Sequence, residues 1–404
     1  MSAEPETAAP TTVAGRMQAY IGAGGVITPL ITVVIAFLVG GLVVALTGRD
    51  PFSTYSAIFD GTGLNWPFLW ISGSDEAEVA AINLQQTLLI TTPLILTGLA
   101  VAFAFRCGLF NIGGQGQFLV GSILAVWVGS SFSGMPALPH ILLAMLAAIA
   151  GGLVWAAVAG LLKATTGAHE VISTIMLNWV AIWVGVWLFG LGGPLQNDRD
   201  ASLPVSNDIV EAAKLPVFWG DPVLQGLHVG LFVALGALVV FWVLLNRTTF
   251  GYEVRAVGFN PEAARASGIS VTRNYVLAMG VCGLFAGLAG SLDVLGWQFR
   301  LATNDIQISN IGFTGIAVAL LGRNTAIGVA FSALLFGALI TGTSVRNLDP
   351  AVFEPALASN LTLTIQGLVI LFVSTDLLVA YLWRFRRLGR RRAGPEAAAL
   401  EARA

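Results

Sequence analysis

Long apolar runs alternate with short polar stretches over most of the chain. A helix needs about 20 mostly apolar residues to cross a lipid bilayer. The pattern therefore predicts an all-α polytopic protein with about ten transmembrane helices, some of them short or broken. The runs lie near 26–47, 86–105, 113–132, 140–162, 171–191, 226–246, 274–295, 306–321, 325–343 and 361–383.

The composition agrees with a membrane protein. Of the 404 residues, 56% are hydrophobic and 10% are charged, whereas soluble proteins carry about 25% charged residues. The first apolar run is too long for the core of a signal peptide, so we expect it to be a retained span. Cys107 and Cys282 lie in or beside apolar runs and do not indicate a disulfide framework.

Lys and Arg are concentrated on one side of the predicted membrane. If the N-terminus is cytoplasmic and the spans alternate, 15 of the 20 Lys and Arg residues fall in cytoplasmic segments. Because cytoplasmic loops carry an excess of these residues, both termini are expected in the cytoplasm. The expected organisation is a cytoplasmic segment 1–25, a transmembrane domain 26–383 and an Arg-rich cytoplasmic tail 384–404. Two long outer loops, 48–85 and 192–225, form either a covering or a docking surface.

A glycine- and amide-rich stretch, AFRCGLFNIGGQGQF, interrupts the apolar pattern at 104–118. In a bilayer, non-helical backbone is tolerated only where it is buried in protein or lines a wet cavity. Transporters often place interrupted helices along the solute path, so Asn111, Gln115 and Gln117 are candidate pathway residues. The alternative is close helix packing through small residues, with the amides bonded across helices. Asn178, at mid-membrane depth, is expected to face the protein interior because an unpaired amide is costly there.

The predicted cytoplasmic loop 247–273 contains the sequence NPEAARASG at 260–268. Asn260 favours a helix N-cap, Pro261 the first turn, and Gly268 the end. A short capped helix is therefore predicted, which either connects two spans or docks into another protein. The small residues that would allow close approach are Ala263, Ala264 and Ala266.

Several kinds of chemistry are missing from the sequence. There is no G-x-x-x-x-G-K-[ST] motif, so the chain is not expected to bind ATP through a P-loop. His and Cys show no metal-ligand spacing, and no Ser-His-Asp set suggests a hydrolase. Acids inside the spans are few, mainly Asp293 and Asp376, whereas a proton- or sodium-driven carrier would show more. The polar groups inside the predicted spans are mostly neutral amides, which suit a neutral, hydrogen-bonding solute. An importer without its own energy source needs a partner that supplies the energy.

Four motifs follow one another along the chain. They are FRCGLFNIGGQGQFLVGSILA at 105–125, GAHEVISTIMLNWVA at 167–181, VGFNPEAARASGIS at 257–270 and GFTGIAVALLGRNTAIGV at 312–329. The first resembles the R-x-G-x-F-N-I-G-x-E-G-Q signature of branched-chain amino acid/ribose-type permeases of ABC importers. The others resemble more closely the subgroup that imports nucleosides and related simple sugars. The resemblance covers roughly 86–383.

The resemblance implies a fold of about ten helices in two halves related by a weak repeat, in a bacterial plasma membrane. It also implies three protein partners: a second permease subunit, expected to be a related but different chain, a cytoplasmic ATP-binding subunit and an extracytoplasmic solute-binding lipoprotein. ATP and Mg would be bound by the ATPase, with no cofactor in this chain and no nucleic acid partner. The segments 1–25 and 384–404 lie outside the resemblance.

By this resemblance, NPEAARASG is a coupling helix that docks on the ATPase. Its residues echo the E-A-A-x-x-x-G pattern of ABC permeases, and the expected coupling residues are Gly258, Asn260, Glu262, Ala263, Ala264 and Gly268. The expected pathway residues are Asn111, Gln115, Gln117, Asn178, Asn310, Phe313 and Gln366. Gln115 departs from the family pattern, which usually has Glu there, so a charge-based role at that position is in doubt.

The sequence thus predicts a permease subunit of an ATP-driven importer for nucleosides or a related neutral, sugar-bearing solute. The chain itself is expected to be a transport subunit and not an enzyme. A branched-chain amino acid or simple sugar permease is the alternative within the same class. A secondary carrier or channel that works alone is the alternative from another class, and a structural membrane scaffold is a third.

Overall fold

The computed structural model of the chain describes residues 27–73, 76–221, 226–344, 360, 363–368 and 371. It divides into two compact units, one with residues 1–51 and 363–404 and the other with residues 52–362. In the first unit, the described part consists mainly of helix α2 (Ile27–Leu46), and residues 363–368 are also helical.

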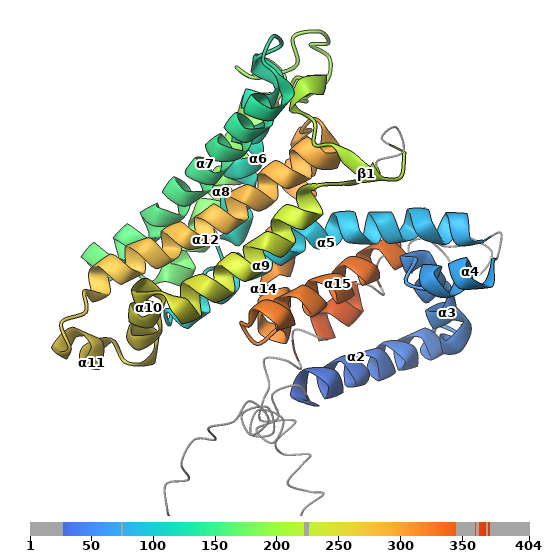
Figure 1. The fold of residues 1–404 in the computed structure, drawn as a ribbon, viewed down its shortest axis with the longest axis horizontal. Coiled ribbons are helices and arrows are strands. Elements are labelled where there is room, and N and C mark those ends of the chain that lie inside the picture. The colour runs from blue at the N-terminus through green and yellow to red at the C-terminus, as the bar shows by residue number, and fades with distance from the viewer. Residues whose placement is uncertain are drawn as a thin grey trace, which may run out of the picture. The chain divides into compact units, whose positions relative to one another are not determined.

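The second unit is built almost entirely from helices (Figure 1). Its only described sheet pairs two short antiparallel strands between α8 and α9. The elements are α3 (Pro51–Thr62), α4 (Trp66–Ser72), α5 (Ala77–Arg106), α6 (Gly114–Ser131), α7 (Ala137–Thr166), α8 (Glu170–Phe189), η1 (Glu211–Ala213), β1 (Val217–Trp219), β2 (Leu227–His228), α9 (Gly230–Arg247), α10 (Thr249–Phe259), α11 (Pro261–Ala266), α12 (Val271–Asp293), η3 (Val294–Gln298), α13 (Thr303–Ile308), α14 (Ile311–Leu321) and α15 (Ala326–Gly342).

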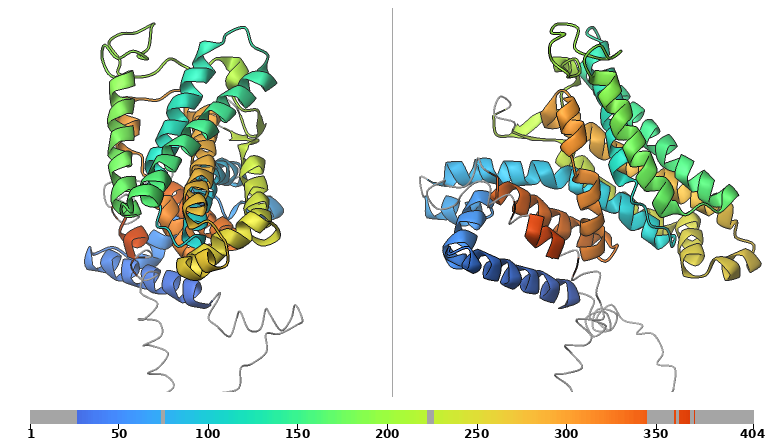
Figure 2. Two further views of the ribbon diagram at one scale, coloured as in Figure 1. Left: turned by 90° about the vertical axis from the view of Figure 1, so that its left-hand side faces the viewer. Right: turned by 180° about the vertical axis from the view of Figure 1, so that it is seen from behind.

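Helices α5 and α12 form the centre of this unit. Helix α5 packs against α12, α14 and α15, and α12 also packs along α6 and α7 (Figure 1 and Figure 2). Glycines permit the close approach of α7 and α12: a Cβ atom on Gly283 would lie 2.0 Å from the carbonyl oxygen of Gly152. Small residues at helix interfaces are typical of membrane proteins, where dispersion between backbones replaces hydrophobic burial.

The helices confirm the predicted all-α polytopic class. Among the described residues, six helices are long and apolar enough to cross a membrane, namely α2, α5, α7, α8, α9 and α12. The predicted runs 113–132, 306–321 and 325–343 correspond to α6, α14 and α15, and of these α14 and α15 are shorter, with 11 and 17 residues. The run 361–383 lies largely outside the described residues, as do both termini. The count of ten spans and the cytoplasmic termini therefore stay predictions.

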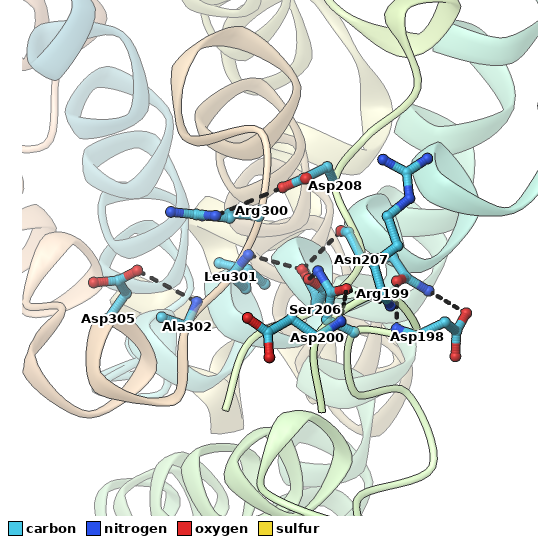
Figure 3. Close-up of polar contacts among 11 residues, drawn as sticks. Asp198, Arg199, Asp200, Ser206, Asn207, Asp208, Arg300, Leu301, Ala302 and Asp305 are labelled. Carbon is cyan, nitrogen blue, oxygen red and sulfur yellow. Dashed lines mark hydrogen bonds and ion pairs between the residues drawn. The ribbon is translucent and has the colours of Figure 1, made fainter. Parts of the chain in front are cut away.

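The loop between α8 and β1 folds back onto the segment that follows α12 (Figure 3). The backbone N–H of Ser206 donates to the carbonyl of Leu301 at 2.8 Å, and that of Ile209 donates to the carbonyl of Phe299 at 2.8 Å. The Ser206 hydroxyl in turn accepts from the N–H of Leu301 at 2.9 Å. These bonds fix the chain where it leaves α12. Several exposed charged side chains, including Asp198 and Arg300, lie on this surface.

Candidate functional site

The glycine- and amide-rich stretch forms a break between α5 and α6. Helix α5 ends at Arg106, and α6 begins at Gly114. The N–H of Leu109 donates back to the carbonyl of Ala104 at 3.0 Å, and Gly108 takes a left-handed φ of 74°. This geometry is a common glycine-dependent helix end. The sequence-based prediction of a break at this stretch is therefore confirmed.

Two of the predicted pathway amides pair with each other at the break. The Nδ2 of Asn111 donates to Gln117 Oε1 at 3.0 Å, and Gln117 Nε2 donates back to Asn111 Oδ1 at 3.0 Å. Both residues are fully buried. In this structure each amide therefore stabilises the other, with its polar atoms turned toward the protein.

Asn178 of α8 forms hydrogen bonds with backbone groups that have no helical partner at the break. Its Oδ1 accepts from the N–H of Gly116 at 2.8 Å, and its Nδ2 donates to the carbonyl of Ile112 at 3.0 Å. The N–H of Gly116 lies in the first turn of α6, where helices have no internal acceptor. Asn178 faces the protein interior, as predicted from its depth.

Gln115 joins the break to the start of α14. Its Nε2 donates to the carbonyl of Ser309 at 2.8 Å, and its Oε1 accepts from the N–H of Gly312 at 2.8 Å. An ionised glutamate could accept from Gly312 but has no donor for the Ser309 carbonyl. The amide at this position therefore fits its surroundings, and its role here is hydrogen bonding, without any charge.

The side chains of the other predicted pathway residues form no hydrogen bond within this network among the described residues. Asn310 is exposed at the N-terminus of α14, and Phe313 is 39% exposed on its first turn. Gln366 is half-buried and belongs to the other unit. The structure thus brings four of the seven predicted residues together, namely Asn111, Gln115, Gln117 and Asn178.

The predicted coupling segment forms a capped helix, α11. Asn260 Oδ1 accepts from the N–H groups of Glu262 at 3.0 Å and Ala263 at 3.1 Å, and Pro261 stands in the first turn. Gly268 has a φ of 83° directly after the helix. The caps predicted at both ends of this segment are confirmed.

One residue of the coupling segment differs from expectation. Ala264 is only 4% exposed because it packs against this chain, so it does not offer the close approach to another protein that its small size suggested. Its carbonyl accepts from the N–H of Ile269 at 3.0 Å, which closes the helix end. The outward surface of α11 includes Glu262, Ala263 and Arg265.

The coupling segment contacts the helix break through two glycines. A Cβ atom on Gly258 would lie 2.3 Å from the carbonyl oxygen of Arg106, and one on Gly108 would lie 3.2 Å from the Cα atom of Gly258. Only glycine permits this approach of the two backbones. The C-terminal end of α10 therefore rests directly on the turn that leads to Asn111.

The sequence did not predict a hydrogen-bonded contact of the Arg106 side chain at the same end of α5. The Nε and Nη2 atoms of Arg106 donate to the carbonyl of Asn324 at 3.0 and 2.8 Å. Arg323 and Asn324, in the break between α14 and α15, have left-handed φ angles of 51° and 53°. The only sequence signal was that both segments carry a family motif. In the described parts of the chain, no group of three or more His, Cys, Asp or Glu residues is placed to hold a metal ion.

Comparison with known proteins places this chain among membrane permeases. The model of the family "Branched-chain amino acid transport system / permease component" matches residues 83–374. The chain is 38% identical over 357 residues to the guanosine ABC transporter permease protein NupP of Bacillus subtilis, covering 88% of this chain and 94% of that protein. It is 32% identical over 360 residues to the nucleoside ABC transporter permease protein NupB of Lactococcus lactis, covering 88% and 92%.

A glucose ABC transporter permease protein of Haloferax volcanii is 35% identical over 356 residues, with 86% of this chain and 87% of that protein covered. No solved structure matches the chain significantly. The match to the family model spans most of the helices described above, and the apolar helices make the chain a multi-pass protein of the bacterial plasma membrane. The protein therefore belongs to the permease-component family of branched-chain amino acid transport systems, whose members are transport subunits of ABC transporters.

Proposed function

We propose that the chain forms the translocation pathway of an ATP-driven importer for nucleosides or a related neutral, sugar-bearing solute. The observation that carries the proposal is its likeness, over nearly its whole length, to two permeases named for guanosine and nucleosides.

Energy for transport would come from a separate subunit. The sequence has no P-loop, so ATP and Mg would be bound by a cytoplasmic ATPase. We propose that α11 docks on that subunit through its outward residues Glu262, Ala263 and Arg265. Asn260 and Gly268 would set the ends of the helix, Ala264 would hold it to this chain, and Gly258 would connect it to α5.

The second permease subunit would be a related but different chain. Two permeases of B. subtilis match this chain, NupP at 38% identity and NupQ at 27%, and two of L. lactis do so, NupB at 32% and NupC at 26%. This chain would take the place of NupP or NupB, beside a partner similar to NupQ or NupC. An extracytoplasmic solute-binding lipoprotein would deliver the solute.

The proposed membrane domain is 26–383, with 1–25 and 384–404 in the cytoplasm. Asn310, Phe313 and Gln366 remain candidate pathway residues. The likeness to a glucose permease supports a simple sugar as the second candidate solute. Nucleosides and glucose share a hydroxyl-bearing ring, so the two candidates require similar hydrogen-bond partners.

The test is uptake by the assembled transporter in proteoliposomes. The chain would be co-expressed with its second permease, ATPase and binding protein, and uptake of labelled guanosine, glucose and leucine would be compared. We expect guanosine uptake that requires internal ATP and resists an uncoupler of proton and sodium gradients. Uptake that follows an ion gradient without ATP would contradict an ABC importer. Preferred uptake of glucose or leucine would contradict the nucleoside assignment.

A further inference from the structure

The end of α12 opposite α11 carries a polar cluster that the amide network does not include. Helix α12 continues beyond Asp293 as a π-helical turn, η3, and Phe299 then takes a left-handed φ of 57°. The N–H of Phe299 bonds to the carbonyl of Val294 at 2.9 Å, five residues back. Single π-helical turns within α-helices occur frequently at functional sites.

The π-helical turn brings two side chains to one carboxylate. Trp297 Nε1 donates to Asp293 Oδ1 at 2.7 Å, and Gln298 Nε2 donates to Asp293 Oδ2 at 2.5 Å. The wider turn of a π-helix returns both the fourth and the fifth residue toward the face of the first. Asp293 is 1% exposed and forms no ion pair within the described ranges, so both of its oxygens are committed to positioning these neighbours.

The opposite side of the turn is anchored to other parts of the chain. The N–H of Leu215 donates to the carbonyl of Leu295 at 2.9 Å. A Cβ atom on Gly296 would lie 2.1 Å from His228 Nε2, so the backbone is pressed against that ring. The turn is thus held from one side, while Trp297 and Gln298 remain half-buried.

Gln298 has an unused acceptor in this arrangement. Its Nε2 is occupied by Asp293, but its buried Oε1 has no hydrogen-bond partner among the described residues. A buried polar atom without a partner is costly, so such an atom in a native protein calls for an explanation. Because this oxygen is closed off here, a donor on a bound solute would supply the missing bond in a state of the transport cycle that exposes Gln298.

We propose that Trp297 and Gln298 form a solute-contact site at this end of α12, with Asp293 as the positioning residue for both. The solute would donate a hydrogen bond to Gln298 Oε1 and place its ring against the Trp297 indole, since stacking on aromatic side chains tolerates any flat ring. The two side chains bonded to Asp293 are uncharged, so the cluster offers no cation to pair with an anionic ligand. The site therefore fits a neutral, ring-bearing solute with hydrogen-bond donors. This assignment to the nucleoside class rests on the proposed function.

The test compares solutes across variants of the assembled transporter in proteoliposomes with saturated binding protein. Initial uptake rates of guanosine, inosine, 2′,3′-dideoxyguanosine and glucose would each be divided by the parent rate. Gln298→Leu is expected to lower guanosine uptake about tenfold, as the loss of one buried hydrogen bond would. The loss should be smaller for whichever analogue lacks the donor that Oε1 accepts.

Variants at Trp297 and Asp293 distinguish a residue that contacts the solute from one that only positions its neighbours. Trp297→Leu should reduce uptake of the nucleosides more than that of glucose. Trp297→Phe keeps a ring but loses the bond to Asp293, and should have an intermediate effect. Asp293→Asn leaves one donor unpaired and should weaken the same discrimination between solutes, whereas Asp293→Glu should restore part of it. Trp183→Leu, at an exposed tryptophan of α8 that is 60% accessible, is the matched control and should leave all ratios unchanged.

The outcomes separate this proposal from the proposed function. If the parent imports nucleosides but the Gln298 and Trp297 variants lower all solutes equally, the cluster is structural and the proposal fails alone. Unchanged rates in these variants would also overturn it. A parent that imports none of the nucleosides would refute the proposed function, and the solute-contact site with it.

Discussion

Replacing Asn178 with leucine tests whether the amide at the helix break stabilises the fold or contacts the solute. Leucine has a similar size but no polar atoms, so it would leave the N–H of Gly116 and the carbonyl of Ile112 without their bonds of 2.8 and 3.0 Å. Asn178 is 2% exposed, so water has little access to replace these partners. Each unpaired buried group costs about 1–3 kcal/mol, so the pair would lower the free energy of unfolding by about 2–6 kcal/mol.

The assay is thermal unfolding of the purified permease in detergent, together with uptake normalised to folded protein. We expect a lower unfolding midpoint and a loss of uptake that follows the loss of folded protein, with the preference between solutes unchanged. Asn246→Leu is the matched control, because Asn246 is an exposed amide near the end of α9 that donates to the carbonyl of Trp242. Its unfolding midpoint should stay close to that of the parent.

The opposite result would refute the reasoning. If Asn178→Leu keeps the parent's unfolding midpoint but loses uptake per folded molecule, the amide contacts the solute or moves during transport. The hydrogen bonds to Gly116 and Ile112 would then belong to only one state of the transport cycle.

Three further predictions concern other parts of the chain. Gly258→Ala would place a Cβ atom 2.3 Å from the carbonyl oxygen of Arg106. We expect reduced assembly with the ATPase in a pull-down, or lower stimulated ATP hydrolysis. Parental values in both assays would refute a tight contact. Ala263→Trp, on the outward surface of α11, should release the ATPase in detergent while the permease still inserts, and a complex that transports normally would make α11 a connector only. Burial lowers the pKa of His228 to about 4, against about 6.5 in an unfolded chain, so the unfolded state binds the proton first. Stability should therefore fall by up to roughly 3 kcal/mol as the pH drops from about 6.5 to 4, and His228→Gln should show a smaller drop in unfolding midpoint over that window.

Features that depend on local sequence could be predicted well. The helix ends at Asn260 and Gly268 follow from side-chain capping and from the left-handed conformation that glycine permits. The break at 107–113 begins at Gly108, whose left-handed φ of 74° ends α5 and is readily adopted only by glycine. In both cases the deciding interactions lie within a few residues of one another, so the pattern contains them.

Features that depend on distant segments could not be predicted. Arg106 meets the carbonyl of Asn324 across a separation of 218 residues, and Gln115 meets Gly312 across 197. Ala264 was expected on a docking surface because it is small, but the packing of α11 turns it inward. The π-helical turn at 294–298 also has no local signature, because VLGWQ continues the apolar pattern of α12.

The contacts at the end of α5 connect the proposed coupling helix to both helix breaks. Gly258 presses on the Arg106 carbonyl, while the Arg106 side chain holds the break between α14 and α15. Five residues further on, Asn111 enters the amide network. Glycines have no side chain that could absorb a displacement at these backbone contacts. A movement of one backbone is therefore passed to the other, since packed interiors transmit strain. A shift of α10 caused by the ATPase would therefore act on the two segments where helical hydrogen bonding is already interrupted.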